Sequence, residues 1–345
     1  MEATGQLLTE LCEDLRNEFE ITVVCGQPRA VVDDVPPDAV ELSERNGVAI
    51  RRVRHTRFNK ASFLGRVVNM VTFQLAATWS ALTSRRMDVV VVETDPPFLC
   101  MLGRVLQLLR GGKLVCYLQD VYPDVAVALG KLRPGILARL LRAIFFHIYR
   151  RSDAVVVLSA DMRAPLLESG VPADRIQIVP NWVDTQAVRP LKQGNAFRHS
   201  LGLVEKFVVM YSGNMGLSQR LEHILSAASD LRHRDDIVFV LVGDGADRRN
   251  LERIAADRQL SNVRFVGYQP KDQLADSLSA ADIHLVILRP EVKRLLMPSK
   301  LYGVLASGTP ALVLADADCE LARTVAARSD RPVLVSGDFW RVAGE

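Results

Sequence analysis

One lysine stands where a bound anion would explain its position. In the segment MPSKLYGVLASGTP (Met297–Pro310), Pro298 followed by Ser299 is typical of a helix start, with Ser299 near the cap. Lys300 then lies in the first helical turn, where a cation is unfavourable against the helix dipole. This placement favours an anion bound at that end of the helix. A long side chain bent into solvent is the alternative.

Three glycine-containing turns each follow a predicted strand in the second half of the chain. They are YSGNMG (Tyr211–Gly216), VGDG (Val242–Gly245) and FVGYQP (Phe265–Pro270). Gly213 and Gly216 would let the backbone approach a ligand closely, beside a helix start that suits an anion. With Gly243 and Gly267 at the same edge, a ligand-binding rim is favoured over ordinary tight turns, which remain the alternative.

Acidic residues occupy corresponding positions in the first half. Asp120 and Asp124 of QDVYPD follow the apolar run KLVCYL, and the segment ETDPPF (Glu93–Phe98) follows the preceding strand. Catalytic groups often lie at the carboxyl ends of parallel strands. Each aspartate could instead cap the segment that follows it.

Several enzyme classes and cofactors find no support in the residue pattern. The six histidines form no cluster and read as structural or exposed, and no Cys/His spacing fits a metal site. No Ser-His-Asp order, P-loop or GxGxxG is present, so hydrolase, kinase and dehydrogenase functions are not indicated. We therefore expect no metal and no bound cofactor.

Short apolar runs alternate with helical segments throughout, which predicts parallel sheets covered on both faces. The polar segment TQAVRPLKQGNAFRHS, with Pro190 and Gly194, interrupts this alternation. We therefore predict an α/β fold of two tandem doubly wound Rossmann-like domains with a cleft between them. The domains are residues 1–184, a linker at 185–202, and residues 203–345. In such folds, ligands bind outside the carboxyl ends of the strands.

Composition places the chain among globular proteins. It has 345 residues, 49% of them hydrophobic and 24% charged, and a net charge of +3, which indicates no nucleic-acid partner. Five cysteines without a CxxC pair suit free thiols in a reducing cytosol. The segment Lys131–Arg151 is basic and apolar at helical spacing, without an acidic residue. It could lie on anionic headgroups, or it could simply pack on a sheet with a solvated edge.

Taken in order and spacing, these motifs resemble the GT-B glycosyltransferases of family 4. YSGNMG, VGDG, FVGYQP, LSAADIHLVILRP and MPSKLYGVLASGTP look like their donor-binding domain. In the first half, LQDVYPDVAVALG and the run Asp153–Thr185 are similar to the branch of WcaI- and WbuB-type enzymes of colanic acid and O-antigen (lipopolysaccharide) synthesis. The resemblance covers roughly the whole chain. It implies a retaining, metal-independent hexosyltransferase that uses a UDP- or GDP-linked sugar.

The resemblance also implies roles for individual residues. A nucleotide diphosphate needs backbone N–H groups and a cation. The implied donor-binding residues are Gly213, Asn214, Gly216, Gly243, Gly267, Tyr268, Pro298, Ser299, Lys300 and Glu320. Asp120 and Lys300 are the implied catalytic residues, and Gln119 and Asp124 are implied on the acceptor side. Asn214 and Gln219 occupy positions where many members carry basic residues that bind the diphosphate. The resemblance therefore implies that Lys300 binds it here, with Lys293 or Arg294 as further candidates.

The expected function is transfer of a sugar to a lipid-linked saccharide acceptor, in exopolysaccharide, capsule or O-antigen synthesis. The expected location is cytoplasmic, at the inner face of the membrane, in peripheral contact with anionic lipid. Two alternatives stay open: a non-catalytic binding protein of the same fold, and a nucleotide-sugar epimerase. Family members normally open with a strand and a glycine-rich turn before a helix resembling Ala3–Glu18. We therefore expect a chain shortened at both ends, whose first sheet lacks its first strand and exposes apolar surface near Ile21–Cys25.

Overall fold

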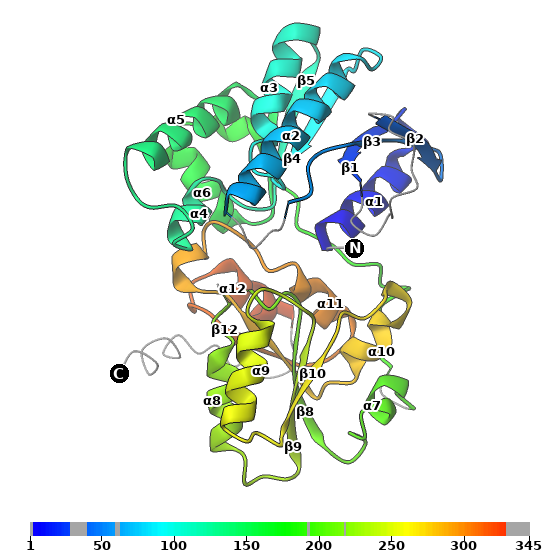
Figure 1. Cartoon of the computed structure of the whole chain (residues 1–345), viewed down its shortest axis with the longest axis vertical. Helices are drawn as coiled ribbons and strands as arrows, with labels where there is room; N and C mark the ends of the chain where they lie inside the picture. Colours follow the sequence, from blue (N-terminus) through cyan, green and yellow to red (C-terminus); the bar gives the residue numbers. More distant parts are fainter. Residues whose placement is uncertain (1–2, 28–39, 59–62, 192–193, 217–218, 329–345) are drawn as a thin grey trace. The chain divides into compact units, whose positions relative to one another are not determined.

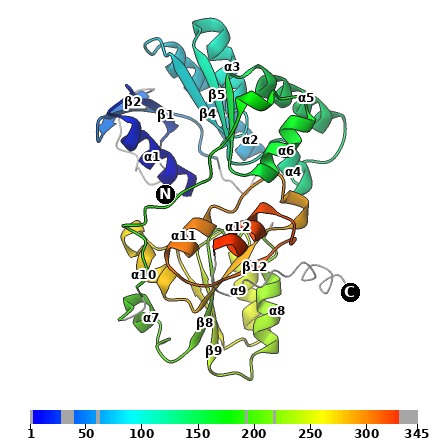
Figure 2. The same ribbon diagram turned by 180° about the vertical axis from the view of Figure 1, so that it is seen from behind.

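The structure, a computed structural model, describes residues 3–27, 40–58, 63–191, 194–216 and 219–328 (Figures 1 and 2). The chain forms two compact units. The first comprises Met1–Val127, Leu132–Leu158 and Arg163–Val179, and the second comprises Ala128–Lys131, Ser159–Met162 and Pro180–Glu345. A further short apolar run, PVLV (Pro332–Val335), from which the sequence predicts a strand, lies outside the described residues.

The first unit alternates strands and helices. Its elements are α1 (Ala3–Leu15), β1 (Thr22–Gly26), β2 (Val40–Arg45), β3 (Val48–Val53), α2 (Phe63–Leu82), β4 (Val89–Glu93), α3 (Leu99–Arg110), β5 (Lys113–Leu118), α4 (Asp124–Ala128), α5 (Ile136–Arg151), β6 (Ala154–Val157), α6 (Ala160–Glu168) and β7 (Ile176–Ile178). The four strands β4-β5-β6-β7 form a parallel sheet in that order. A separate sheet has the order β1-β3-β2.

The β2–β3 hairpin is an element that the alternation of apolar runs and helices did not predict. Its strands are joined by Asn46 and Gly47, both with positive φ (48° and 79°). An Asn-Gly pair between two strands is the strongest short-range hairpin signal, so the sequence did carry the information. Both strands mix polar and apolar residues, and most of their residues are half-buried or exposed.

The edge strand of the larger sheet in the first unit exposes apolar side chains. Val89 and Val91 of β4 are 47% and 57% exposed, whereas Val90 and Val92 are buried. Along β1, Thr22 is exposed and the following residues are half-buried. The exposed apolar surface expected near Ile21–Cys25 is therefore not found at those residues, and β4 exposes apolar side chains instead.

The second unit holds one five-stranded parallel sheet with the order β10-β9-β8-β11-β12. Its elements are α7 (Ala196–Ser200), β8 (Phe207–Ser212), α8 (Glu222–Asp230), β9 (Ile237–Val242), α9 (Arg248–Asp257), β10 (Val263–Val266), α10 (Leu274–Ser279), β11 (Ile283–Ile287), α11 (Lys300–Ala306), β12 (Ala311–Leu314) and α12 (Glu320–Arg328). Helices α8 and α9 lie side by side (Figure 1).

Alternate residues of the central strands enter two different cores. On β8, Tyr211 packs with Leu225 of α8 and Leu251 of α9 in one cluster. Its neighbours Val208 and Met210 pack with Leu203 and other residues on the opposite face. Burial on both faces explains why these strands read as continuous apolar runs. The predicted α/β class, with parallel sheets in two tandem units, is confirmed.

Candidate functional site

The turns after β8 and β9 are bonded to one another through their backbones. The N–H of Gly213 donates to the carbonyl of Val242 at 2.9 Å, and that of Met215 donates to the carbonyl of Asp244 at 2.8 Å. Gly213 and Gly243 have φ of +146° and +134°, a region that favours glycine. A Cβ on Gly243 would lie 2.0 Å from the Gly213 carbonyl oxygen, so no side chain fits there.

Lys300 reaches from the first turn of α11 to these turns. Its Nζ lies 3.7 Å from the centroid of the Tyr211 ring, a cation–π contact. The same Nζ lies 3.1 Å from the position that a Cβ on Gly213 would take. The absent side chain of Gly213 therefore leaves the space that the ammonium occupies.

The ammonium of Lys300 is enclosed without a counter-charge. The residue as a whole is half-buried, but its charged end lies against the Tyr211 ring and the β8 turn. Burial lowers the pKa of Lys300 from 10.5 to about 7. Within the described residues, no carboxylate forms an ion pair with it. A cation held in this way without a carboxylate partner suits the binding of an anion.

The buried side chains of Tyr211 and His284, beside Lys300, are neutral near pH 7. Tyr211 is buried, and its hydroxyl donates to the carbonyl of Asn214 at 2.8 Å, which ties the strand to its own turn. On the adjacent strand β11, His284 is fully buried with Nε2 2.8 Å from the Leu278 carbonyl. Burial lowers the pKa of His284 to about 4, so it stays neutral near pH 7. His284 is structural, as the sequence indicated for the histidines in general.

The remaining predicted donor residues follow strands of the same sheet. The exposed Tyr268, after β10, donates through its hydroxyl to the carbonyl of Asp244 at 3.2 Å and so joins the second and third turns. Gly267 has open space where a Cβ would be, and Pro298 is buried before α11. Glu320 begins α12, with Oε2 3.5 Å from Arg323. Gly216 ends the described part of the first turn.

Lys293, a further candidate for binding the diphosphate, forms ion pairs with two aspartates. Its Nζ lies 2.9 Å from Asp316 and 2.8 Å from Asp318, and these two carboxylates raise its pKa. A lysine that two aspartates neutralise offers little net charge to a phosphate. The sequence could not show this, because the two aspartates come more than twenty residues later in the chain.

In the first unit, hydrogen bonds to one hydroxyl group connect the carboxyl ends of β4 and β5. Thr94 Oγ1 accepts from the backbone N–H of Gln119 at 3.1 Å and from that of Asp120 at 3.3 Å. Glu93, the last residue of β4, accepts from the N–H of Asp95 at 2.7 Å. Burial raises the pKa of Glu93 to about 7, and Asp95 and Asp120 add to the effect. The only sequence signal for Glu93 was its position at the end of an apolar strand.

Asp124 has a structural partner. Both carboxylate oxygens lie 3.0 Å from Nε of Arg142 on α5, and the Arg142 guanidinium stacks 4.2 Å from the Phe146 ring centroid. This pair fixes α4 against α5. The acceptor-side role predicted for Asp124 stays a prediction, as do the roles of Gln119 and Asp120.

The described residues contain no disulfide and no cluster of side chains that could hold a metal ion. All five cysteines there are free thiols, and no group of three or more His, Cys, Asp or Glu side chains could hold a metal ion. None of the helices that the structure describes is both long and apolar enough to cross a bilayer. The enclosed lysine at the glycine turns is therefore the strongest candidate site.

Comparison with known proteins decides the family. Residues 3–182 match the family model described as "Glycosyl transferase 4-like domain", and residues 195–318 match "Glycosyl transferases group 1". The chain belongs to this glycosyltransferase family. The family resemblance inferred from the motifs is thus confirmed, and each unit carries one of the two family domains.

Named relatives agree with this assignment. The chain is 31% identical over 268 residues to WcaI of Escherichia coli K12, named as a colanic acid biosynthesis glycosyl transferase; the match covers 75% of this chain and 66% of WcaI. It is 32% identical over 273 residues to the glycosyltransferase WbjE of Pseudomonas aeruginosa, covering 78% of this chain and 68% of WbjE. The matched chain thus spans about two thirds of each relative.

A solved structure agrees on the fold. The crystal structure of Anabaena HepE in complex with UDP-glucose superposes with a TM-score of 0.70, covering 99% of this chain and 85% of HepE. Its 13% identity makes this a likeness of fold alone. The GT-B fold predicted for the chain is therefore confirmed.

Proposed function

We propose that this chain transfers a sugar, with retention of configuration, from a UDP- or GDP-linked donor to a lipid-linked saccharide during polysaccharide synthesis at the inner face of the cytoplasmic membrane. The observation that carries the proposal is the enclosed Lys300 ammonium between the β8 turn and the Tyr211 ring, without a carboxylate partner. The family membership and the named role of WcaI in colanic acid synthesis support it.

The donor diphosphate is the anion that this site suits. A diphosphate needs a cation and backbone N–H groups within reach, in a place where water does not screen them. Lys300 supplies the cation, and the Gly213 turn brings backbone to the same point. The fold likeness to HepE, whose structure holds UDP-glucose, supports a nucleotide-sugar rather than a simple phosphate.

The proposed reaction needs little acid–base chemistry from the protein. The bond between the sugar's anomeric carbon and the diphosphate oxygen breaks while the acceptor hydroxyl attacks from the same face. The hydroxyl proton passes to the departing phosphate oxygen, so the products are the glycoside and the nucleoside diphosphate. Lys300 stabilises the negative charge that develops on the leaving group, which is electrostatic catalysis. This accounts for the lack of a conspicuous catalytic pair at the donor turns.

The acceptor is proposed to bind at the carboxyl ends of β4 and β5. Asp120 and Gln119 are held there by Thr94, and Asp120 would accept a hydrogen bond from an acceptor hydroxyl. The supporting feature is that Thr94 holds the backbone of both residues at the carboxyl end of β5, where ligands of parallel sheets bind. Positioning of this kind lowers the barrier by orientation rather than by proton transfer.

Titration calorimetry with UDP and GDP tests the donor half of the proposal. One of the two nucleotides is expected to bind to the wild-type protein, and Lys300→Met should weaken that binding by roughly 10- to 100-fold, the loss of one charge-assisted contact. Lys206→Met is the matched control, because Lys206 precedes β8, at the end of that strand opposite the glycine turn, and its ammonium donates to the Asp235 carbonyl before β9. Absence of binding by either nucleotide to the wild-type protein would contradict the proposal.

A further inference from the structure

Helix α5 is apolar on two opposite faces. Its inner face buries Ala138, Phe145 and Tyr149 in the core of the first unit. On the outer face, Ile136, Leu137 and Leu140 are 86%, 60% and 55% exposed. Because the inner face is anchored by the aromatic contacts of Phe145 and Tyr149, the helix cannot rotate to bury the outer face instead.

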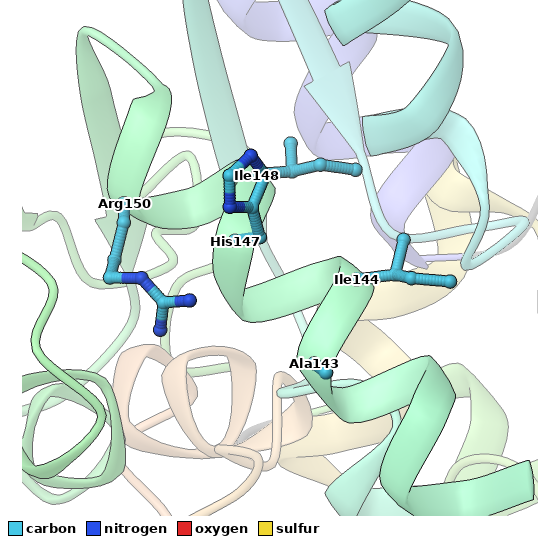
Figure 3. A pocket seen from close by; sticks show the side chains of 5 residues that line it. All are labelled: Ala143, Ile144, His147, Ile148 and Arg150. Carbon is cyan, nitrogen blue, oxygen red and sulfur yellow. The ribbon is translucent and has the colours of Figure 1, made fainter.

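The apolar surface continues along the helix beyond Leu140. Ile136, Leu140, Ala143 and His147 follow one another at spacings of four, three and four residues, which places them on one stripe. A hollow of about 430 Å³ lies at the far end of this stripe, and its lining residues are Ala143, Ile144, His147, Ile148 and Arg150. Figure 3 shows Ile144 and Ile148 projecting to one side of the helix, and Arg150 projecting to the other. The outer face thus offers apolar contact over about two turns, from Ile136 to Ala143, and the exposed His147 follows them.

Cations border the stripe. Arg133, Arg139 and Arg151 are exposed, and none of them forms an ion pair within the described residues. Two further arginines of the helix are used inside the unit, since Arg142 bonds to Asp124 and Arg150 donates to the Ser169 carbonyl. No acidic residue occurs between Asp124 and Asp153. The segment 125–152 therefore contributes positive charge and no negative charge to this face.

We propose that the outer face of α5 docks on an anionic lipid bilayer. Ile136, Leu137 and Leu140 enter the boundary between headgroups and acyl chains, and the bordering arginines lie against lipid phosphates. Association with a second copy is disfavoured, because a symmetric contact would bring the same arginines together without an acidic partner. The inference rests on the proposed function only in that a lipid-linked acceptor gives the docking a purpose.

Helix α2 supplies a matched control. It also exposes an apolar stripe, comprising Leu64, Val68, Val71, Leu75 and Trp79. Arg66 is the only charged residue of that helix, so its stripe lacks the bordering cations. If exposed apolar surface alone caused membrane binding, the α2 stripe would serve as well as α5.

Vesicle sedimentation of the full chain, without donor or acceptor, tests the proposal. The probes are vesicles of phosphatidylcholine with about one third phosphatidylglycerol, and vesicles of phosphatidylcholine alone. The wild-type protein should bind the anionic vesicles more tightly, and salt should weaken the binding. Leu137→Ser with Leu140→Ser should reduce binding at least tenfold. Arg133→Gln with Arg139→Gln should reduce it about fivefold for each charge removed.

Three results would overturn the proposal. The first is that the wild-type protein does not sediment with anionic vesicles. The second is a Leu64→Ser with Leu75→Ser variant that loses binding while the α5 variants keep it. The third is wild-type protein that forms dimers in solution, which the Leu137→Ser, Leu140→Ser variant separates. Nucleotide affinity measured on the same variants should be unchanged, so failure of docking and failure of the proposed function can be told apart.

Discussion

The enclosed ammonium of Lys300 makes donor affinity depend on pH in a calculable way. Burial holds the pKa of Lys300 at about 7 in the free protein. A bound diphosphate lies beside the ammonium and favours its charged form, so binding at higher pH must first add a proton. The affinity is therefore full below pH 7 and declines as pH rises above it.

The expected size follows from the charged fraction of Lys300. With a pKa of about 7, the apparent dissociation constant rises about tenfold per pH unit above neutrality, and roughly thirtyfold between pH 6 and pH 8.5. Neighbouring groups do not titrate in this range, because burial holds His284 near 4 and raises the pKa of Tyr211.

The assay is titration calorimetry with an intact nucleotide-sugar at several pH values from 6 to 8.5. The donor is preferred to the free nucleotide, because its diphosphate is esterified at both ends and keeps its charge throughout. Lys300→Met should bind weakly and independently of pH, whereas Lys206→Met should retain the wild-type slope. A flat wild-type profile would refute the reasoning, since Lys300 would then be charged before the donor arrives or would not touch it.

Further predictions concern stability and the remaining site residues. Lys300→Met should raise the free energy of unfolding at pH 7, and denaturant titrations should show this advantage shrinking by up to about 1.4 kcal/mol per unit above pH 7, as the native lysine becomes neutral while the unfolded one stays charged. Gly243→Ala should lower the unfolding free energy by at least about 1–3 kcal/mol, because φ there is +134° and the new Cβ meets backbone. A double-mutant cycle of Asp124→Ala and Arg142→Ala should give a coupling of about 0.5–1 kcal/mol, and zero coupling would remove the pair from the account of α4. Glu320→Ala should weaken donor binding, because the family resemblance implies that Glu320 contacts the ribose of the donor, and unchanged affinity in calorimetry would show that it does not.

Most of the fold could be predicted from the sequence because most strands of the larger sheets are continuous apolar runs, such as β4 and β9. The apolar run KLVCYL, for example, coincides with strand β5 (Lys113–Leu118). The β2–β3 hairpin was missed although Asn46 and Gly47 signal its turn. Half-buried strands that mix polar and apolar residues give a weaker hydrophobic pattern in the sequence than fully buried strands do.

The same distinction applies to the candidate site, where local features could be predicted and contacts made by folding could not. Lys300 could be singled out because its conflict with the helix dipole is local in the sequence. The Tyr211 ring beneath it and the pairing of Lys293 with Asp316 depend on residues brought together by folding, and no local pattern shows them. The raised pKa of Glu93 likewise depends on burial between strands that only the tertiary structure defines.

The most direct test of the central claim follows the sugar itself. UDP- and GDP-linked sugars, radiolabelled in the sugar, are incubated with the wild-type protein and lipid-linked saccharide acceptors, and the label is measured in the organic phase. The account predicts that label enters the lipid with release of one nucleoside diphosphate per sugar, and that Lys300→Met abolishes both. Release of nucleotide without labelled lipid, or conversion of the donor to an isomer without an acceptor, would contradict it.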